Sequence, residues 1–440
     1  MRIAVIGSGV SGLGAAWTLA RRHHVTMYES DDRLGGHANT WEIEDRGRVM
    51  PVDTGFIVYN ERNYPNLVHL FEAVGVATER SDMSFSVSIG DGAFEYRARA
   101  LGLAAQPSNL LRPSYLRMAR EIVRFTRQAK SLLAGGVGES TGEWLHRHGY
   151  SAAFRNDFLL PMVACIWSSK LHEMLAVPAA TIAGFLDNHG LLDLGDRPQW
   201  RTVTGGSREY VRRVAATVDE VRPGTPVASV TRGSGSALVR DATGRTERFD
   251  HVVLATHADT TLAILGNDAS PDERRLLSLF RYQQNLAVLH RDRAFMPRRQ
   301  RAWSSWNYLS RERAGANKRD EPGVSLTYWM NLLQNLETER PVLVTLNPLE
   351  EPRHQVASFT YHHPQYDRAT VEAQAALPTL QGVQRTWFCG SYFGHGFHED
   401  GLRSGLEVAR ALGAPAPWAS DDKGAEIDAR GSIGAALVGG

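Results

Sequence analysis

Three glycines and one glutamate near the start of the chain have the types and spacing that bind a dinucleotide. Gly7, Gly9 and Gly12 form a G-x-G-x-x-G motif, and Glu29 follows 22 residues after Gly7. In such a motif the first glycine permits a tight turn, the second lets the backbone approach a pyrophosphate, and the third allows close packing of helix and strand. The acidic residue accepts hydrogen bonds from ribose hydroxyls. These four residues therefore predict a site for a dinucleotide.

The surrounding sequence predicts the elements that would position this site. The apolar run at 2–6 is typical of a buried parallel strand, an Ala/Leu-rich segment after Gly12 is typical of a helix, and a second strand ends at Glu29. The helix would offer free N–H groups and the positive end of its dipole to phosphates, with Ser11 in its first turn. A glycine-rich surface turn with an exposed glutamate is the alternative, and the strand–turn–helix order favours the dinucleotide site.

The segment after this strand, "SDDRLGGHANT", adds a second glycine loop. Two consecutive glycines would let the loop lie against an extended diphosphate, and the nearby arginine would add charge-assisted hydrogen bonds. With the first motif, the segment resembles the amine oxidase and phytoene desaturase group of FAD-dependent oxidoreductases, whose motif continues as E-x-x-x-R-x-G-G-R. His37 stands where that group usually has arginine. The resemblance implies FAD as the cofactor, bound here by Ser30, Arg33, Gly35, Gly36 and His37.

Later segments continue the resemblance. "VMPVDTGFIVY" resembles the family strand that runs to the flavin ring, "GTPVASVTR" resembles the strand that brackets the adenine, and "FDHVVLATHADTTLAIL" resembles the V-V-x-A-T-x strand. "EDGLRSG" resembles a helix start that points at the pyrimidine edge of the flavin, where its dipole would stabilise negative charge. Ser391 replaces the acidic residue common in the family. The resemblance adds these cofactor contacts: Gly55, Phe56, Ile57, Val227, Gly390, Ser391, Asp400, Gly401 and Leu402.

Cofactor motifs near both ends of the chain predict a discontinuous domain. We expect an α/β fold, in which a Rossmann-like FAD-binding domain (GR2 type) is interleaved with an α+β substrate domain. The FAD-binding domain is expected at 1–80, 200–265 and 385–413, and the substrate domain at 81–199 and 266–384. The first substrate segment has a largely helical pattern, and the second alternates strands and turns. Residues 418–440, rich in small and charged types, are expected to form a disordered tail.

His398 is the candidate catalytic residue. In the amine oxidase branch, an aromatic residue just before the terminal helix stands over the flavin, and matching "GFHEDGL" to that pattern places His398 or Phe397 there. An imidazole in that position could exchange a proton near neutral pH. The alternative is a histidine that only packs on the ring or caps the helix.

The lysines argue against a simple amine oxidase. That branch commonly holds a lysine–water pair at flavin N5, and this chain has four lysines, Lys130, Lys170, Lys318 and Lys423. None of them falls in a convincing strand of the expected substrate domain.

The ring-rich strands of the expected substrate domain have two interpretations. They could form the walls of an apolar substrate tunnel, or the core of a sheet. The residues concerned are Trp303, Trp306, Trp329, Met330 and Leu332. Cys165 and Trp167 have the same two interpretations. Whether His37 or Cys165 bonds covalently to flavin stays open.

A finer resemblance narrows the expected substrate. "YPNLVHLFEAVGV", "SDMSFSVS", "GGHANT" and "GFHEDGL" are similar to the oxidase-like N-terminal half of plant cyclopropane fatty acid synthases and to bacterial fatty acyl flavin desaturases. This resemblance implies an apolar, lipid-like substrate that gives up a hydride, such as an unsaturated or methyl-branched fatty acyl chain. An amine oxidase, a carotenoid-type desaturase and a flavin-bound, non-enzymatic partner of a lipid methyltransferase remain alternatives.

Composition excludes several other classes of function. The formal net charge of +1 over 440 residues gives no sign of nucleic acid binding. The two cysteines, Cys165 and Cys389, lie far apart, so we expect a reducing compartment, no disulfide and no metal site. No apolar run approaches the roughly 20 residues that span a bilayer, and the opening strand leaves no room for a signal peptide. We therefore expect a cytoplasmic location.

One segment bears on membrane contact. Its basic residues fall at helical intervals of three and four: Arg117, Arg120, Arg124, Arg127 and Lys130. Such a basic amphipathic helix could lie on an anionic membrane, which would place the protein peripherally at the inner membrane surface. The alternative is a solvated surface.

Overall fold

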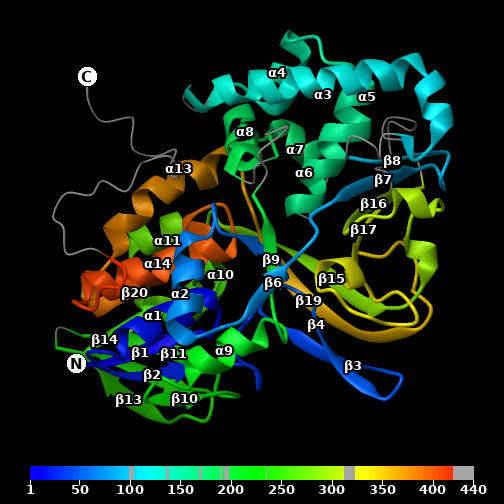
Figure 1. Cartoon of the computed structure of the whole chain (residues 1–440). Coiled ribbons are helices and arrows are strands. Elements are labelled where there is room, and N and C mark those ends of the chain that lie inside the picture. The colour runs from blue at the N-terminus through cyan, green and yellow to red at the C-terminus, as the bar shows by residue number, and fades with distance from the viewer. Residues whose placement is uncertain are drawn as a thin grey trace.

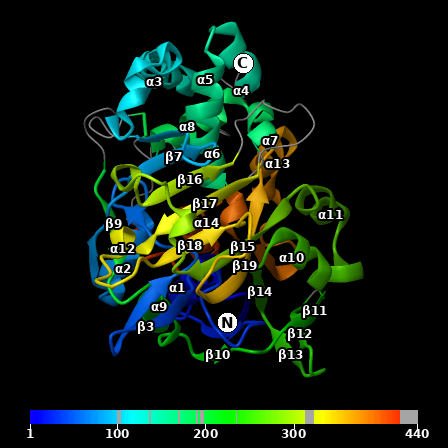
Figure 2. The same ribbon diagram turned by 90° about the vertical axis from the view of Figure 1, so that its right-hand side faces the viewer.

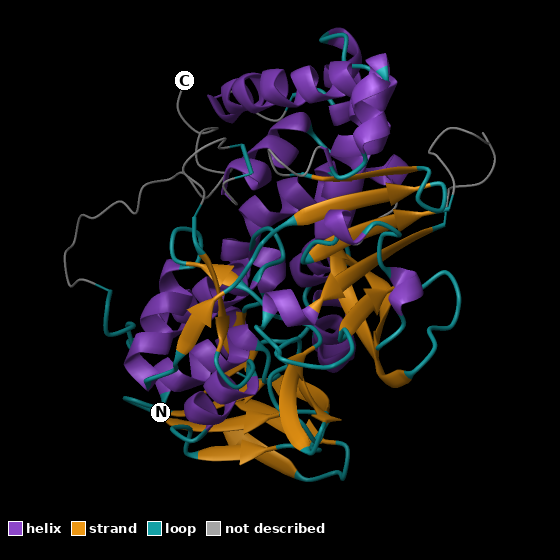
Figure 3. Cartoon of the chain, turned by 45° about the vertical axis from the view of Figure 1, so that its right-hand side comes forward, coloured by secondary structure: helices purple, strands orange, loops and turns teal. Residues whose placement is uncertain are grey.

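The computed structural model describes residues 1–98, 104–134, 138–167, 171–188, 191–192, 198–233, 235–311 and 323–419. A parallel sheet and a larger, mostly antiparallel sheet are the two main sheets of the molecule (Figure 1). The helices between residues 113 and 188 gather at one end of it (Figure 3). The Rossmann-like α/β fold class predicted from the sequence is confirmed.

The parallel sheet has the order β10-β2-β1-β14-β20. Its strands are β1 (Arg2–Ile6), β2 (His24–Tyr28), β10 (Glu220–Arg222), β14 (His251–Leu254) and β20 (Thr386–Phe388). Ile3 and Val5 of β1 join one hydrophobic cluster, and Ala4 and Ile6 join another on the opposite face. Burial on both faces explains why these strands are continuously apolar rather than alternating.

Helices cover one face of this sheet. They are α1 (Val10–Leu19), α2 (Pro65–Val74), α9 (Arg208–Ala215) and α14 (His398–Ala411). Glycines let α1 and α14 pack closely, because a Cβ added at Gly405 would lie 2.2 Å from the carbonyl oxygen of Ser11. The core of this layer therefore depends on two segments from opposite ends of the chain.

A three-stranded antiparallel sheet and three helices cover the other face. The strands are β11 (Val227–Arg232), β12 (Ala237–Asp241) and β13 (Thr246–Phe249), and the helices are α10 (Ala258–Leu265), α11 (Pro271–Leu277) and α13 (Arg368–Ala376). Both α11 and α13 lie in the segment where we expected strands and turns. Each begins with a capping box, at Ser270 and at Asp367, which stabilises the start of a helix.

The larger sheet has the order β19-β15-β18-β17-β16-β7-β8, with one parallel pair, β16 and β7. Its strands are β7 (Phe85–Ile89), β8 (Phe94–Arg97), β15 (Arg281–His290), β16 (Trp306–Ser310), β17 (Val324–Trp329), β18 (Leu343–Leu346) and β19 (Gln355–Gln365). The short helix α12 (Met330–Leu333) follows β17. The large sheet is thus built from two segments that are far apart in the sequence, as the interleaved organisation requires.

Two small sheets connect these parts. One is the hairpin of β3 (Thr40–Asp45) and β4 (Arg48–Asp53), and the other joins β5 (Tyr59–Asn60), β9 (Trp200–Val203) and β6 (Thr78–Arg80). In the second sheet β9 pairs with both partners, so the chain between residues 81 and 199 leaves and returns at the same place.

The helical layer contains α3 (Pro113–Ser131), α4 (Thr141–Arg147), α5 (Ala152–Phe154), α6 (Leu160–Trp167), α7 (Leu171–Ala176) and α8 (Ala179–Asn188). Figure 2 shows this layer beyond the β7 and β16 side of the large sheet. None of the described helices combines the length and the apolar content that crossing a membrane requires.

The C-terminal segment is packed as far as the structure describes it. Trp418 stacks on Trp17, with ring centroids 5.6 Å apart, and its Nε1 donates to Asn66 Oδ1 at 3.1 Å. The first residue of the expected disordered tail is therefore held in place, and residues 420–440 lie outside the described residues.

Candidate functional site

A cavity of about 610 Å³ is lined by residues of the parallel sheet and of the larger, mostly antiparallel sheet. The turn after β1 contributes Gly7 and Gly9, and the large sheet contributes Trp306 and Tyr328. Its volume is in the range of sites that enclose cofactors and small ligands, about 300–1,000 Å³. The cavity is therefore the candidate for both cofactor and substrate.

The turn between β1 and α1 presents backbone to this cavity. Gly7 has φ +103° and donates its N–H to the carbonyl of Tyr28 at 2.8 Å, which continues the pairing of β1 with β2 to the start of the turn. A Cβ added at Gly9 would meet nothing within 4 Å, so the backbone of Gly9 is open to an approaching group. The first N–H groups of α1 have no partner within the helix and can donate to phosphate oxygens.

The Glu29 carboxylate joins this turn to the next one. Its Oε2 accepts from the Ser8 N–H at 2.9 Å and the Ser8 hydroxyl at 2.5 Å, and its Oε1 accepts from the Ser30 hydroxyl and the Asp31 N–H, both at 3.0 Å. Glu29 and Ser30 both line the cavity beside Val227. This arrangement places an acceptor at the end of β2, where the dinucleotide motif requires one for a ribose.

The second glycine loop contributes Gly36 and His37 to the lining, but not Arg33 or Gly35. The Arg33 guanidinium donates to the carbonyls of Leu34, Gly36 and Ala38 at 2.8–3.1 Å. Arg33 thus holds the loop in shape from behind, and the phosphate contact expected of it stays a prediction.

Most of the predicted cofactor residues line the cavity. These are Gly7, Gly9, Ser11, Glu29, Ser30, Gly36, His37, Gly55, Phe56, Ile57, Val227, Gly390 and Ser391. The predicted residues that lie outside the lining are Gly12, Arg33, Gly35, Asp400, Gly401 and Leu402. Gly401 and Leu402 pack α14 against α1: Leu402 is fully buried, and a Cβ added at Gly401 would lie 2.9 Å from Val10 Cγ1. Asp400 accepts from the N–H groups of His395 and Phe397. The expected cofactor contacts of Asp400, Gly401 and Leu402 also stay predictions.

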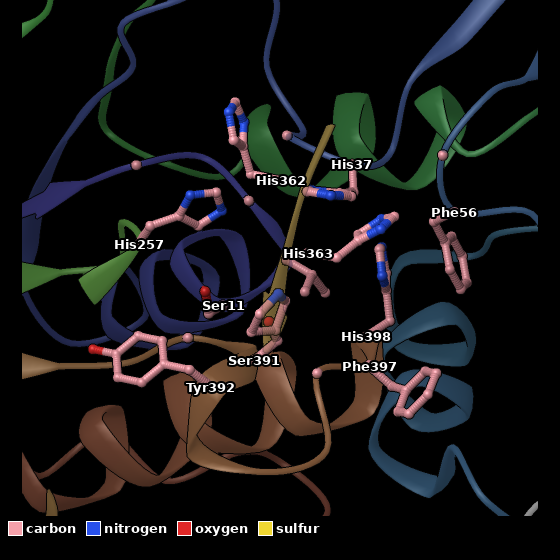
Figure 4. Close-up of a pocket in the computed structure, with 18 of the residues that line it drawn as sticks. Ser11, His37, Phe56, His257, His362, His363, Ser391, Tyr392, Phe397 and His398 are labelled. Atoms are coloured by element: carbon pink, nitrogen blue, oxygen red, sulfur yellow. The ribbon is translucent and has the colours of Figure 1, made fainter. Parts of the chain in front are cut away.

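His398, the predicted catalytic residue, lines the cavity at the first position of α14. Its ring lies beside that of Phe56 (Figure 4). The two rings are stacked, with centroids 3.7 Å apart and planes at 13°. His398 Nε2 lies 3.2 Å from the hydroxyl of Tyr210. Burial lowers the pKa of His398 to about 3, so the imidazole is neutral at physiological pH. The catalytic role expected of His398, and the alternative that it only packs on the ring or caps the helix, both stay predictions.

Phe397, the other candidate for that position, also lines the cavity. Its ring stacks on Phe185 of α8, with centroids 5.0 Å apart. The two candidate residues therefore contact different walls of the cavity. His398 packs against Phe56, which lies between β4 and β5, whereas Phe397 packs against the helical layer.

Four further histidines line the cavity and were not predicted: His257, His362, His363 and His395. Burial lowers the pKa of His257, and it lowers the pKa of His363 to about 4. Burial also lowers the pKa of His37 well below its usual value. These three rings are therefore neutral, and the described residues hold no group of three or more side chains suited to a metal ion. The sequence signal that could have indicated two of the four histidines was the doublet "HH", His362 and His363, near the end of β19.

The lining residues that lie outside the parallel sheet and its glycine turns are largely aromatic and aliphatic, and we call this part of the cavity the apolar end. It includes Tyr64, Met83, Phe185, Leu191, Trp200, Trp306 and Tyr328. Trp306 and Tyr328 form an edge-to-face pair across β16 and β17, with centroids 5.0 Å apart. Of the residues proposed as tunnel walls, Trp306 lines the cavity. Trp303, Trp329, Met330 and Leu332 do not, and Met330 is fully buried as a core residue would be.

Charge is nearly absent from the described lining. It contains one carboxylate, Glu29, and neither lysine nor arginine. Lys130 is exposed on α3, and Lys170, Lys318 and Lys423 lie outside the described residues. The side chains of Cys165 and Trp167 also lie outside them.

Asp53 is buried outside the lining and stabilises the cavity wall. Its carboxylate accepts from Thr40 Oγ1 at 2.6 Å, from the Ser207 N–H at 2.9 Å and from Gln334 Nε2 at 2.9 Å. Burial raises the pKa of Asp53 to about 6. Asp53 thus joins β4 to the start of α9 and to the end of α12, just before the cavity residue Gly55.

The residues of the cavity fit FAD. The open backbone at Gly9 suits a diphosphate, and the neighbouring Glu29 and Val227 suit an adenosine. The buried hydroxyls of Tyr366 and Tyr392 also line the cavity and have no hydrogen-bond partner among the described residues. Flat rings on both walls suit an isoalloxazine.

The comparisons with known proteins agree with this assignment. The family model "Flavin containing amine oxidoreductase" matches residues 10–413. A putative flavin-containing monoamine oxidase of Mycobacterium tuberculosis is 25% identical over 63% of this chain and 61% of its own length. A carotenoid phi-ring synthase of Streptomyces griseus is 28% identical over 61% of this chain and 54% of its own length. The chain thus spans less than two thirds of these curated relatives.

Solved structures share the fold. Putrescine oxidase bound to putrescine superposes with a TM-score of 0.67 at 17% identity, covering 94% of this chain and 99% of that one. A fatty acid isomerase of P. acnes superposes with a TM-score of 0.66 at 17% identity, covering 93% and 98%. Because the family model covers most of the chain, the chain belongs to the flavin-containing amine oxidoreductase family.

Proposed function

We propose that the enzyme takes a hydride from a C–H bond of a lipid acyl chain, unsaturated or methyl-branched, in a desaturase or oxidase reaction. The observation that supports this substrate class is the composition of the cavity. Its substrate end is lined by aromatic and aliphatic side chains, and its one described carboxylate, Glu29, lies at the dinucleotide end. FAD, when bound, supplies the hydride acceptor.

Formation of a double bond also takes a proton from the adjacent carbon, and the neutral imidazoles of His37 and His398 are acceptors for it in the described lining. Apart from this proton transfer, the chain's own residues act by position. Trp306, Tyr328 and Phe185 exclude water from the apolar end and hold a flexible chain in one place. The neutral rings of His37 and His398 supply flat surfaces without charge. Removing a hydride from a C–H bond depends mainly on such positioning and on a dry site.

Two other substrate classes have specific support. A carotenoid-type polyene is favoured by the identity with carotenoid phi-ring synthase, and an amine is favoured by the identity with the putative monoamine oxidase. An ammonium group would find no carboxylate at the apolar end among the described residues, so its burial there would be costly. A non-enzymatic role beside a lipid methyltransferase would require a flavin that no substrate reduces.

Anaerobic mixing of the purified enzyme with candidate substrates tests the proposal. Lipids with unsaturated or methyl-branched acyl chains should bleach the flavin band at roughly 450 nm. Met83→Glu, which adds a carboxylate to the apolar end, should slow this bleaching, whereas Met83→Gln should slow it less. Fast bleaching by a polyamine or by a carotenoid, with none by lipid, would reject the lipid assignment. Bleaching by no compound in the panel would reject the enzymatic proposal.

A further inference from the structure

The segment that contains α3 has a charge unlike that of the rest of the chain. Residues 104–134 carry six basic residues and one acidic residue, Glu121, whereas the whole chain of 440 residues has a net charge of +1. Glu121 is buried, and it accepts from Arg117 Nε at 3.0 Å and from the Ser151 hydroxyl. The exposed surface of this segment is therefore strongly positive.

The same segment exposes large aliphatic side chains. Among the described residues, thirteen large hydrophobic side chains are exposed, and five of them lie here. Their exposed fractions are 44% for Leu110, 85% for Leu111, 39% for Leu116, 40% for Val123 and 45% for Leu133. Isolated exposed leucines need no explanation, but a concentration of them on one element marks a contact surface.

Helix geometry places the aliphatic and basic residues together. Leu116, Arg120, Val123, Arg127 and Lys130 follow one another at intervals of four, three, four and three, so they share one face of α3. All five are exposed. We call these residues the α3 face. The opposite side of the helix is buried through Tyr115, Met118, Phe125 and Ala129.

The structure corrects the basic stripe that the sequence predicted. The Arg124 guanidinium does not join the α3 face, because it lies over the ring of Tyr150 at 4.0 Å. Arg117 is paired with Glu121. Arg124 and Arg117 therefore lie outside the α3 face, which combines three exposed basic residues with two exposed aliphatic ones.

The position of α3 connects this face to the cavity. Figure 1 shows α3 along the outer edge of the helical layer, at the end of the molecule away from β1 and β2. On its inner side α3 packs against α8, and Phe185 of α8 lines the apolar end of the cavity. One helix thus separates the α3 face from the apolar end.

We propose that the α3 face, with Leu111 beside it, docks the enzyme on an anionic phospholipid surface. Its cations complement lipid phosphates, and its leucine and valine side chains can enter the acyl boundary, as in amphipathic helices that lie in the interface plane. Protein interfaces are instead enriched in tyrosine, tryptophan and arginine around a core depleted of charge, and the α3 face carries no aromatic residue. The docking proposal depends only on the exposure and charge of the α3 face. The further step, delivery of a lipid from the membrane to the cavity, also depends on the proposed function.

Flotation of the FAD-loaded enzyme with vesicles tests this proposal. The enzyme should float with phosphatidylcholine vesicles that contain phosphatidylglycerol, not with phosphatidylcholine alone, and added NaCl should release it. Arg120→Gln with Arg127→Gln should lower the partition coefficient on the order of 30-fold, since each basic residue near the surface contributes about fivefold. Leu116→Ser with Val123→Ser should lower it about tenfold. Leu238→Ser with Arg240→Gln, at exposed positions of β12, is the matched control and should float like wild type.

The outcomes separate the possibilities. Unchanged flavin content and melting temperature would show that the α3 variants fold. No flotation of the wild type, or equal flotation of wild type and α3 variants, would overturn the proposal. A dimer that the α3 substitutions dissociate would identify the face as a contact between copies and would also overturn it. Flavin bleaching by detergent-dispersed lipid should survive the α3 substitutions, so failure of docking and failure of the proposed function would be distinct results.

Discussion

Replacing Gly9 with alanine should weaken FAD binding and leave the fold intact, whereas the same replacement at Gly12 should destabilise the fold. Gly9 has φ −62° and ψ 175°, which alanine adopts easily, and its added Cβ meets no protein atom within 4 Å. The Cβ of alanine at position 12 would lie 1.9 Å from the carbonyl oxygen of Gly7 and 3.1 Å from Ala255 Cβ. The two glycines are three residues apart in one motif, yet the space around them differs.

The expected magnitudes follow from these distances. At position 9 the methyl group would project into the space expected for the diphosphate, and overpacking by one carbon costs about 1–3 kcal/mol, or about 5- to 150-fold in the Kd for FAD. Without FAD the same change should be neutral or stabilise by up to about 1 kcal/mol, because alanine lowers the entropy of the unfolded chain. At position 12, helix and strand must separate by more than 1 Å, which costs about 3 kcal/mol or more.

FAD titration and thermal denaturation of the apoprotein measure both quantities. Gly142→Ala on α4 is a matched control, because its Cβ would meet Leu175 at an ordinary 3.4 Å, remote from the cavity. If Gly9→Ala bound FAD as tightly as the wild type, the diphosphate would not lie at this turn. If apo Gly9→Ala melted well below the wild type, the assumption of open space would be wrong.

Three further predictions concern single side chains. Burial raises the pKa of Asp53 to about 6. The stability that protonated Asp53 contributes is therefore present below its unfolded pKa of about 4 and is lost as the pH rises to about 6. Asp53→Asn should remove this part of the pH dependence of the melting temperature. Burial lowers the pKa of His398 to about 3, so His398→Phe should leave the pH profile of turnover unchanged between about pH 6 and 8; a lost ionisation in that range would contradict a neutral ring. Trp306→Ala should raise the KM for an apolar substrate about 10- to 100-fold while the Kd for FAD stays the same; an altered Kd would place Trp306 against the cofactor.

The dinucleotide end of the site could be predicted because its determinants are local. The strand, the turn and the helix that carry Gly7, Gly9 and Gly12 lie within residues 2–19, and Glu29 directly follows the adjacent strand β2. Each of these residues lies where the spacing of the motif requires it. Local hydrogen bonds and turn conformation, which sequence patterns encode well, determine this part of the structure.

The rest of the site depends on tertiary contacts that no local pattern encodes. His257 follows β14, whereas His362 and His363 lie on β19, a strand of the other sheet. The fold brings these strands, which belong to different sheets, to one cavity. The role of Arg33 was also hidden, because the sequence shows a basic residue beside two glycines but not that its donors reach the carbonyls of its own loop. Composition and spacing can identify a phosphate loop without showing which of its side chains support it.

The two helix N-termini that the sequence places at the cofactor differ in their electrostatics. The first turn of α1 holds no acidic residue, so its positive end is fully available to a diphosphate. The first turn of α14 holds Glu399 and Asp400. Asp400 accepts the N–H groups of His395 and Phe397, and Glu399 accepts those of Asn66 and Leu67 at the start of α2.

Carboxylates in the first turn offset the positive end of a helix dipole. The N-terminus of α14 therefore attracts an anion less strongly than the sequence predicts. Burial raises the pKa of Glu399. At low pH Glu399 is therefore protonated sooner than an ordinary glutamate and then no longer offsets the dipole. The hydrogen bonds of Asp400 instead fix the backbone just before His398, and those of Glu399 join the start of α14 to the start of α2. We infer that α1 supplies most of the charge complementarity for the diphosphate, and that α14 chiefly fixes the positions of Phe397 and His398 on the cavity wall.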